Sequence, residues 1–200
     1  ENLGKNNNLT LSSQVEVCKE AASINGSRLG LKTGDKITIK DLLYGLMLCS
    51  GNDAAIQIAV SIGGSVEGFA ELMNKKAEEL GLKDTHFITP HGLDHNEHYT
   101  TAYELALITD YALGIEGIAK VVKTKTYTVM INNNSKTINN TNELLGYLNG
   151  VNGVKTGFTN GAGRCLVTSV EREGLSIITV VLGADTKKIR TKDSIDLIEY

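Results

Sequence analysis

The sequence has no long hydrophobic run, no excess of basic residues and no internal repeat. The longest apolar stretches, Leu42–Cys49 and Ile177–Ala184, are far shorter than the roughly 20 residues that a membrane-spanning helix needs. There are 20 basic and 23 acidic residues, so the net charge of −3 gives no electrostatic support for a nucleic-acid partner. No period of roughly 20–50 residues recurs along the chain, which disfavours a repeat scaffold.

Cysteine is also scarce, and its spacing matches no known motif. Cys18, Cys49 and Cys165 are the three cysteines of the chain, and no two of them form a Cys-x-x-Cys pair. This spacing disfavours a thiolate metal site or a redox motif, and an odd count leaves at least one thiol without a partner in the chain. We therefore interpret the thiols as apolar packing residues, and we expect no metal and no cofactor.

The remaining composition is that of an ordinary globular protein. Of the 200 residues, 41% are hydrophobic and 22% are charged, which suits one substantial domain or two small ones. Up to about residue 123 the hydrophobic pattern has the helical period, with capping residues at the expected places. Helices are predicted from a cap at Thr38 to Cys49, over Asn52–Ile62 and Val66–Leu80, and from a capping box at Thr101 and Glu104 to Leu113.

From about residue 124 the pattern changes to the alternation typical of strands. A hairpin is predicted around the polar cluster Asn132–Ser135, and a strand buried on both faces at Ile177–Leu182. The predicted fold class is α+β, with a helical cluster in residues 1–123 and an antiparallel sheet with a packed C-terminal helix in residues 124–200. The elements predicted in the second part are Lys125–Ile131, Lys136–Ile138, Gly153–Phe158, Gly163–Glu171, Ser176–Ala184 and a helix over Thr186–Tyr200.

Two short motifs carry candidate chemistry, and neither is specific as a string. Ser50-Gly51-Asn52 fits Ser-x-Asn, but Ser23-Ile24-Asn25 fits it too. Lys155-Thr156-Gly157 has a second copy in Lys32-Thr33-Gly34, which is followed by polar residues typical of a tight turn. The copy at residue 155 instead begins a glycine-rich strand, where glycines mark a close approach of ligand or backbone. The corner at Ser50 separates two apolar helices, and simple helix capping is its alternative interpretation.

The two motifs occur in this order about 103 residues apart. With several other segments they make the chain resemble the penicillin-binding-protein and serine β-lactamase superfamily, whose Ser-x-Asn and Lys-Thr-Gly elements they match. Within that superfamily the chain is most similar to the low-molecular-mass D-alanyl-D-alanine carboxypeptidases, which implies a β-lactamase/transpeptidase-like fold. The other segments that carry the resemblance are Gly26–Leu31, Leu48–Ala55, Glu71–Ala77, Pro90–Asp94 and Gly153–Thr159.

The resemblance implies catalytic roles for three residues. In the family, a serine attacks the peptide bond between the two terminal D-alanines of a peptidoglycan stem peptide, and water then hydrolyses the acyl-enzyme. Ser50 is expected to relay a proton to the leaving amine. Asn52 is expected to hydrogen-bond substrate and to orient the family's lysine. Lys155 is expected to place positive charge beside the substrate carboxylate.

The resemblance also implies a substrate-binding strand. The hydroxyl of Thr156 is expected to bind the substrate carboxylate, and Gly157 to let the substrate lie against the strand. The backbone N–H of Phe158 is expected to form half of an oxyanion hole, a type of donor whose removal costs about 10²–10³ in rate. Thr159 is included with these substrate-binding residues.

The family's nucleophile belongs to a Ser-x-x-Lys motif, and no serine of the 200 residues is followed by lysine three positions later. In the resemblance, Glu1-Asn2-Leu3 falls just after that motif. We therefore expect the motif and the first strands to lie upstream of residue 1, and this chain to be inactive by itself. Two alternatives remain. One is a β-lactamase-type hydrolase, against which Ser-Gly-Asn in place of Ser-Asp-Asn argues, and the other is a non-catalytic peptidoglycan-binding module.

Partners and location follow from the same resemblance. It implies a peptidoglycan pentapeptide as substrate, β-lactam antibiotics as inhibitors and an extracytoplasmic place in the cell envelope, with membrane association in the full-length protein. An open sheet edge would permit self-association. His91, His95 and His98, with Asp94 and Glu97, suggest a metal cluster, but in the family this stretch resembles a structural loop and we expect no metal there.

Overall fold

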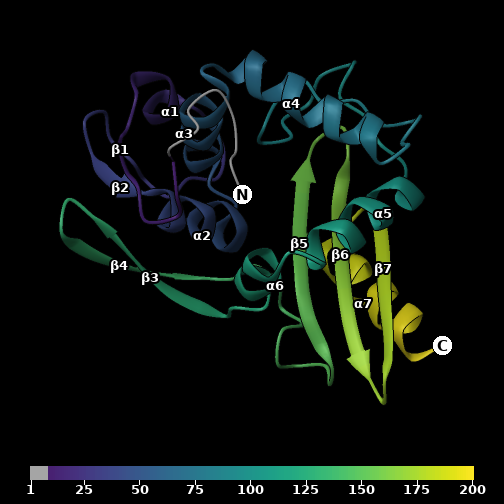
Figure 1. The fold of residues 1–200 in the computed structure, drawn as a ribbon. Coiled ribbons are helices and arrows are strands. Elements are labelled where there is room, and N and C mark those ends of the chain that lie inside the picture. Colours follow the sequence, from purple (N-terminus) through teal and green to yellow (C-terminus); the bar gives the residue numbers. More distant parts are fainter. Residues whose placement is uncertain (1–8) are drawn as a thin grey trace.

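The computed structural model describes residues 9–200, a helical half and a sheet half that lie side by side (Figure 1). The helical half begins with a small two-stranded sheet, and the sheet half contains three antiparallel strands in the order β5-β6-β7. The elements are β1 (Gln14–Glu16), α1 (Lys19–Ser23), β2 (Lys36–Thr38), α2 (Ile39–Cys49), α3 (Asn52–Gly63), α4 (Val66–Glu79), α5 (Ala102–Leu113), α6 (Glu116–Val122), β3 (Thr126–Ile131), β4 (Asn134–Asn139), β5 (Val151–Thr159), β6 (Gly163–Arg172), β7 (Leu175–Ala184) and α7 (Lys187–Glu199).

The predicted helices form, and their ends follow the expected capping chemistry. The side chains of Thr38 and Ser65 accept hydrogen bonds from backbone N–H groups of the first turns of α2 and α4. Helix α3 ends at Gly64, whose φ of 81° is the left-handed conformation common after a helix. The predictions of mixed α+β class and of a packed C-terminal helix are confirmed.

The capping box predicted at the start of α5 forms only in part. Thr101 accepts a hydrogen bond from the N–H of Glu104, as predicted. The Glu104 carboxylate does not turn back to Thr101, however, and it accepts instead from the N–H groups of Lys83 and Asp84 and from the hydroxyl of Thr85. The Thr85 hydrogen bond contributes most to lowering the pKa of Glu104, so this carboxylate anchors the loop before α5.

The hairpin forms, but its strands extend closer to the turn than predicted. Only Asn132 and Asn133 form the turn, and both have a positive φ. Strands β3 and β4 form a separate two-stranded sheet that packs on α2 through the stacked rings of Tyr44 and Tyr127, 3.6 Å apart. The Tyr127 hydroxyl donates to Asp41 at 3.0 Å, and burial together with that hydrogen bond raises the pKa of Tyr127 to about 12. The hairpin therefore packs with the helical core, while the predicted division at residue 123 stays a prediction.

The main sheet positions the second motif. Helices α5 and α6 cover one face and α7 covers the other (Figure 1). The prediction of a strand buried on both faces at Ile177–Leu182 is right in part: α5 and α7 pack on the two faces of β7, but only Thr179 and Val181 of this run are buried and Leu182 is 40% exposed. The buried strand is its neighbour β6, where five consecutive residues from Leu166 to Val170 are buried. Within residues 9–200, no strand pairs with the outer edge of β5 or of β7.

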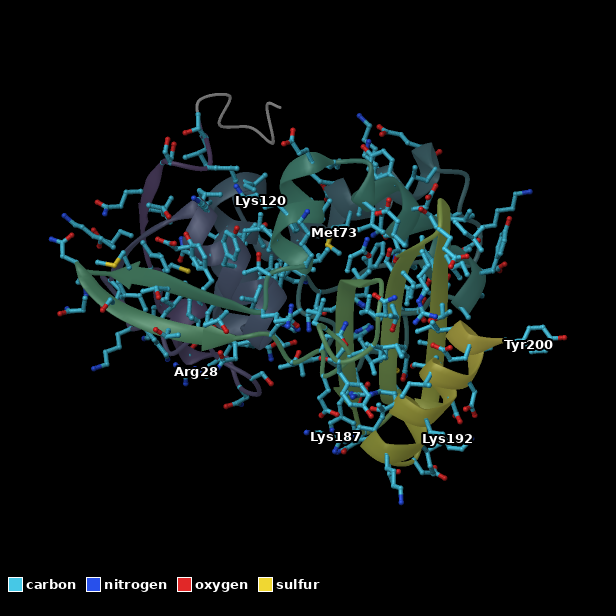
Figure 2. The ribbon with its side chains drawn as sticks, turned by 90° about the horizontal axis from the view of Figure 1, so that it is seen from below. Arg28, Met73, Lys120, Lys187, Lys192 and Tyr200 are labelled. Atoms are coloured by element: carbon cyan, nitrogen blue, oxygen red, sulfur yellow. The ribbon has the colours of Figure 1, made fainter. Side chains whose placement is uncertain are left out.

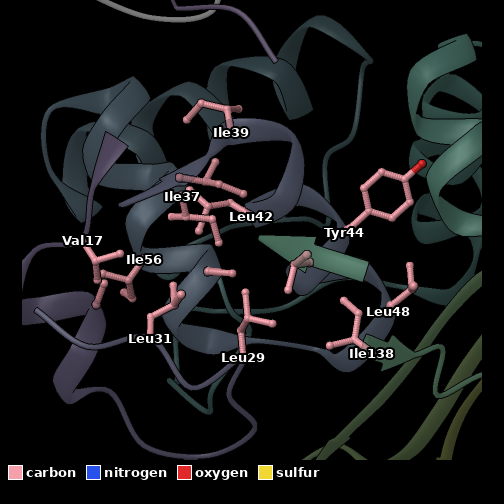
Figure 3. Close-up of a cluster of buried hydrophobic side chains, with 14 of the residues drawn as sticks. Val17, Leu29, Leu31, Ile37, Ile39, Leu42, Tyr44, Leu48, Ile56 and Ile138 are labelled. Carbon is pink, nitrogen blue, oxygen red and sulfur yellow. The ribbon is translucent and has the colours of Figure 1, made fainter. Parts of the chain in front are cut away.

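The largest hydrophobic core lies in the helical half, between α2, α3 and the hairpin (Figure 3). Leu29, Leu42 and Leu48 are fully buried there, together with Ile138 from β4. This core fixes the C-terminal end of α2 and the start of α3, where the first motif lies. In the described part of the chain, residues 9–200, no helix is long and apolar enough to cross a membrane.

Candidate active site

The first motif lies at a strained corner between two buried helices. Ser50 follows the last residue of α2 in the left-handed conformation, with φ 58° and ψ 40°, and its N–H donates to the carbonyl of Gly45. Such a conformation costs a non-glycine residue about 1 kcal/mol or more. A Cβ at Gly51 would lie 3.0 Å from the Asp53 carboxylate and 3.1 Å from the Leu29 nitrogen, so the corner would accept a side chain only if these neighbours moved by a few tenths of an ångström. The turn aims the Ser50 side chain out of the helix pair.

Helix capping alone does not account for the side chains of Ser50 and Asn52. Helix α3 has no side-chain cap, and the Ser50 hydroxyl accepts a hydrogen bond from Lys155 Nζ at 2.8 Å, across 105 residues of sequence. The Asn52 side chain, 7% exposed, donates to the carbonyl of Asn25 at 2.7 Å, and its N–H donates to Ser27. The structure thus brings Ser50 and Lys155 into contact, while Asn52 lines the same cleft without bonding to either.

Lys155 is the most electrostatically perturbed group of this site. Its Nζ donates to Ser50 and to the carbonyl of Thr156, each at 2.8 Å, and no carboxylate of residues 9–200 pairs with it. Burial therefore lowers its pKa to about 8, since desolvation disfavours the ammonium form. A lysine with this pKa exchanges its proton readily near neutral pH.

Thr156, Gly157, Phe158 and Thr159, which the sequence predicts to bind substrate, follow Lys155 along β5. The Thr156 hydroxyl is 2.6 Å from the hydroxyl of Thr141, and the Phe158 ring is 53% exposed. Because β5 is an edge strand, half of its backbone donors point away from β6. The Thr159 hydroxyl accepts from the N–H of Ala162 at 2.9 Å, which engages it in the turn between β5 and β6.

These residues line one cleft of about 710 Å³ between the two halves. Its walls also include residues 26–27, the loop 90–93, residues 141 and 143, and the first turn of α7. Four of its lining residues are cationic, Lys155, Arg164, Lys187 and Arg190, and only Glu143 is anionic. A chain with a net charge of −3 thus places a local excess of positive charge in this cleft, which favours an anionic ligand.

Two of the cleft residues that sequence reasoning missed contribute to the proposed chemistry. Arg190 is 3% exposed, yet its Nε has no hydrogen-bond partner among residues 9–200. Arg190, Ser194 and Ile198 are the buried residues of α7, and they are spaced four apart, on one face of the helix. An arginine on the buried face of a helix is unusual, and this spacing could have identified it from the sequence. Thr141 is the second. Its N–H donates to the carbonyl of Leu48 and its hydroxyl meets Thr156, so it connects the end of α2 to β5, and no local pattern identifies it.

The histidine-rich loop is held by its own hydrogen bonds. His98 accepts from the N–H of Ile88 at 3.1 Å, and burial lowers the pKa values of His91 and His98. Asp94 accepts from the N–H of Gly161, which links this loop to the turn between β5 and β6. Within the part of the chain that the structure describes, no group of three metal-binding side chains occurs.

Comparison with known proteins gives the same family at the level of sequence and of fold. A family model described as D-alanyl-D-alanine carboxypeptidase matches residues 2–186. The chain is 39% identical over 193 residues to the D-alanyl-D-alanine carboxypeptidase DacF of Bacillus subtilis, covering 96% of this chain and 50% of DacF. It is 37% identical to the carboxypeptidase DacC of Escherichia coli, covering 98% of this chain and 50% of DacC. The chain thus spans about half the length of these curated relatives.

The same holds for solved structures. The crystal structure of the Streptomyces K15 DD-transpeptidase superposes with a TM-score of 0.91 at 35% identity, covering 96% of this chain and 80% of that one. The carboxypeptidase DacD from Francisella tularensis superposes with a TM-score of 0.88 at 30% identity, covering 96% of this chain and 59% of that one. From the family match and these superpositions, we conclude that the chain belongs to the D-alanyl-D-alanine carboxypeptidase family of peptidases.

Proposed function

We propose that this chain supplies the substrate cleft and the proton-transfer groups of a serine-type D-Ala-D-Ala carboxypeptidase. The reaction removes the terminal D-Ala of a peptidoglycan stem peptide through an acyl-enzyme. One observation carries the proposal: the 2.8 Å hydrogen bond from Lys155 to Ser50, formed inside a cationic cleft by the two motifs that the family shares. Such a pair is what protonation of a leaving amine requires.

Proton transfer is proposed to pass through Ser50. Its hydroxyl accepts from Lys155, so its own proton remains available to donate to the amine of the departing D-Ala. With a pKa of about 8, Lys155 can replace that proton at neutral pH without a large energetic cost. Asn52, which is fixed by Asn25 and Ser27, is proposed to hold the substrate amide beside them.

Substrate binding is proposed along β5. The Thr156 hydroxyl is suited to the terminal carboxylate of the peptide, and so is the Nε of Arg190, which has no partner among residues 9–200; the charge of Lys155 adds to the attraction. Gly157 keeps the strand surface open, and the N–H of Phe158 is proposed as one oxyanion donor. The 200 residues contain no Ser-x-x-Lys, so no residue of this chain is proposed as the nucleophile.

The setting of the reaction is part of the proposal. A peptidoglycan substrate places the protein in the cell envelope, outside the cytoplasm, with membrane association in the full-length protein. β-Lactams would act as inhibitors because they present a carboxylate and a strained amide to the same groups. The edge of β7, which pairs with no strand of the described residues, would support self-association of isolated chains.

A peptide titration tests the function without requiring turnover. The ¹⁵N-labelled chain is titrated with N-acetyl-Lys-D-Ala-D-Ala and, as a control, with N-acetyl-Lys-L-Ala-L-Ala. We expect the D,D-peptide alone to shift the resonances of Ser50 and of residues 155–159. Equal binding of the two peptides, or shifts outside the cleft, would contradict the proposal.

Gly157 gives the matching variant. A Cβ there would meet the Cβ of Cys165 at 3.4 Å, which is ordinary contact, so Gly157→Ala is expected to fold. The added methyl group would nevertheless occupy the strand surface and weaken D,D-peptide binding at least about tenfold. Gly117→Ala, in open space on α6, is the control and is expected to bind like the parent chain.

A further inference from the structure

Arg164 is a cation of the cleft that the proposed reaction does not use. It is opposite Phe158 in the β5–β6 register, and its guanidinium carbon lies 3.6 Å from the centre of the exposed Phe158 ring. None of the ion pairs found within residues 9–200 includes Arg164. An arginine whose guanidinium lies over a ring can still donate its N–H groups to a carboxylate.

The position of Arg164 separates it from the groups proposed for the terminal carboxylate. Thr156 and Phe158 lie two residues apart on β5 and so project from the same face, about 6.6–6.8 Å apart along the strand. Arg164 adjoins Phe158 on the next strand and on that same face, because directly opposed residues of an antiparallel pair share a face. The cleft therefore has an inner cation, Arg190, and an outer one near the end of β5.

An extended peptide that lies along β5 covers the same distance in two residues. With its terminal carboxylate at Thr156, the side chain of its third residue from the C-terminus comes level with Phe158 and Arg164. We propose that Arg164, stacked on Phe158, is a specificity-determining residue that binds an acidic group on the third residue from the C-terminus of the peptide. This inference rests on the proposed function and specifies which stem peptides the cleft prefers.

Charge elsewhere in the cleft agrees with this assignment. Lys187 lies at the start of α7 (Figure 2). It lines the cleft and is also free of ion pairs within the described residues, whereas Glu143 is the one carboxylate of the lining formed by these residues. Positive charge thus extends from Arg190 to the rim. A neutral third residue would gain at most an uncharged hydrogen bond from Arg164, and a basic one would be repelled, since the guanidinium is a cation that only donates hydrogen bonds.

Two peptides that differ by one charge test the inference. The chain is titrated with N-acetyl-Glu-D-Ala-D-Ala and with its neutral isostere N-acetyl-Gln-D-Ala-D-Ala, and the ratio of the two dissociation constants is measured. We expect the acidic peptide to bind about tenfold more tightly, as a charge-assisted hydrogen bond at a partly desolvated site would give. The ratio should fall in 0.5 M salt, because screening weakens an outer ion pair.

Variants test whether Arg164 causes the difference between the two dissociation constants. Arg164→Gln should bring the ratio to about one, and Arg164→Lys should leave part of it, because lysine keeps the charge without the fork. Lys188→Gln, which removes a cation of α7 outside the cleft lining, should keep the parent ratio. A ratio near one in the parent chain, or a tenfold ratio that survives Arg164→Gln, overturns the inference while D,D-peptide binding itself stands. Failure of both peptides to bind overturns the proposed function and this inference together.

Discussion

Burial of Lys155 is expected to make the stability of the fold depend on pH. Its pKa is about 8 in the folded chain and about 10.5 when exposed. Between these values the unfolded chain binds the proton and the folded chain does not, so the free energy of unfolding rises with pH across this window. Below pH 8 the lysine is charged in both states, and the folded state carries the full desolvation cost of about 3 kcal/mol. From pH 7.5 to pH 10 the gain is about 2 kcal/mol.

Urea unfolding of the parent chain and of Lys155→Met at several pH values measures this effect. Methionine keeps most of the side-chain volume without an ionisable group, so the variant should be more stable than the parent at pH 7.5 and lose that advantage toward pH 10. Lys40→Met, which removes an exposed ammonium, is the control and should follow the parent at every pH. Parallel pH profiles for the parent and Lys155→Met would refute the assignment of a desolvated lysine.

Two further predictions concern the corner and its support, and a third concerns acylation. In the Lys155→Met background, where no ammonium donates to Ser50, Ser50→Gly should raise the free energy of unfolding by about 1 kcal/mol in urea, because glycine adopts the left-handed conformation without strain, and an unchanged or lower stability there would contradict the strained corner. Asp53 is fully buried and accepts from four backbone N–H groups, so Asp53→Ala should cost at least about 3 kcal/mol, whereas the exposed Asp185→Ala should cost little. The 200-residue chain should form no covalent adduct with labelled penicillin, and a mass increase equal to one penicillin would refute this.

Local chemistry explains why most helices could be predicted. Thr38, Ser65 and Thr101 are good caps at the start of apolar runs of helical period, and each caps a helix in the structure. Strand burial was harder, because the apolar run Ile177–Leu182 has the composition of an inner strand. Helices α5 and α7 pack on its two faces, but how completely they cover an edge strand such as β7 depends on tertiary packing rather than on local sequence. The short strands β1 and β2 and helix α6 have too few residues to show a clear period.

The residues of the site also divide into those that a local motif identifies and those that only the folded structure identifies. Ser50 and Lys155 could be proposed because each belongs to a motif, and the distance between them in sequence is irrelevant once α2 and β5 pack at one cleft. Thr141 and Arg164 belong to no motif. Their relevance comes from a hydroxyl 2.6 Å from Thr156 and from a ring 3.6 Å below a guanidinium, and both depend on strand register rather than on local sequence.

Three costs to stability meet at this cleft. Ser50 has a strained backbone, Lys155 is a desolvated cation, and Arg190 has a buried N–H without a partner in the described chain. A residue selected for packing alone would carry none of these costs to stability. Ser50→Gly would remove the backbone strain, Lys155→Met the desolvated charge and Arg190→Leu the buried N–H. Their coincidence around one cationic cleft is what a ligand with a carboxylate and an amide nitrogen that must be protonated as it leaves would justify, because such a ligand supplies the missing hydrogen bonds and charge. We therefore expect bound D,D-peptide to stabilise the parent chain more than Ser50→Gly or Lys155→Met, and equal stabilisation of all three would separate these costs from ligand binding.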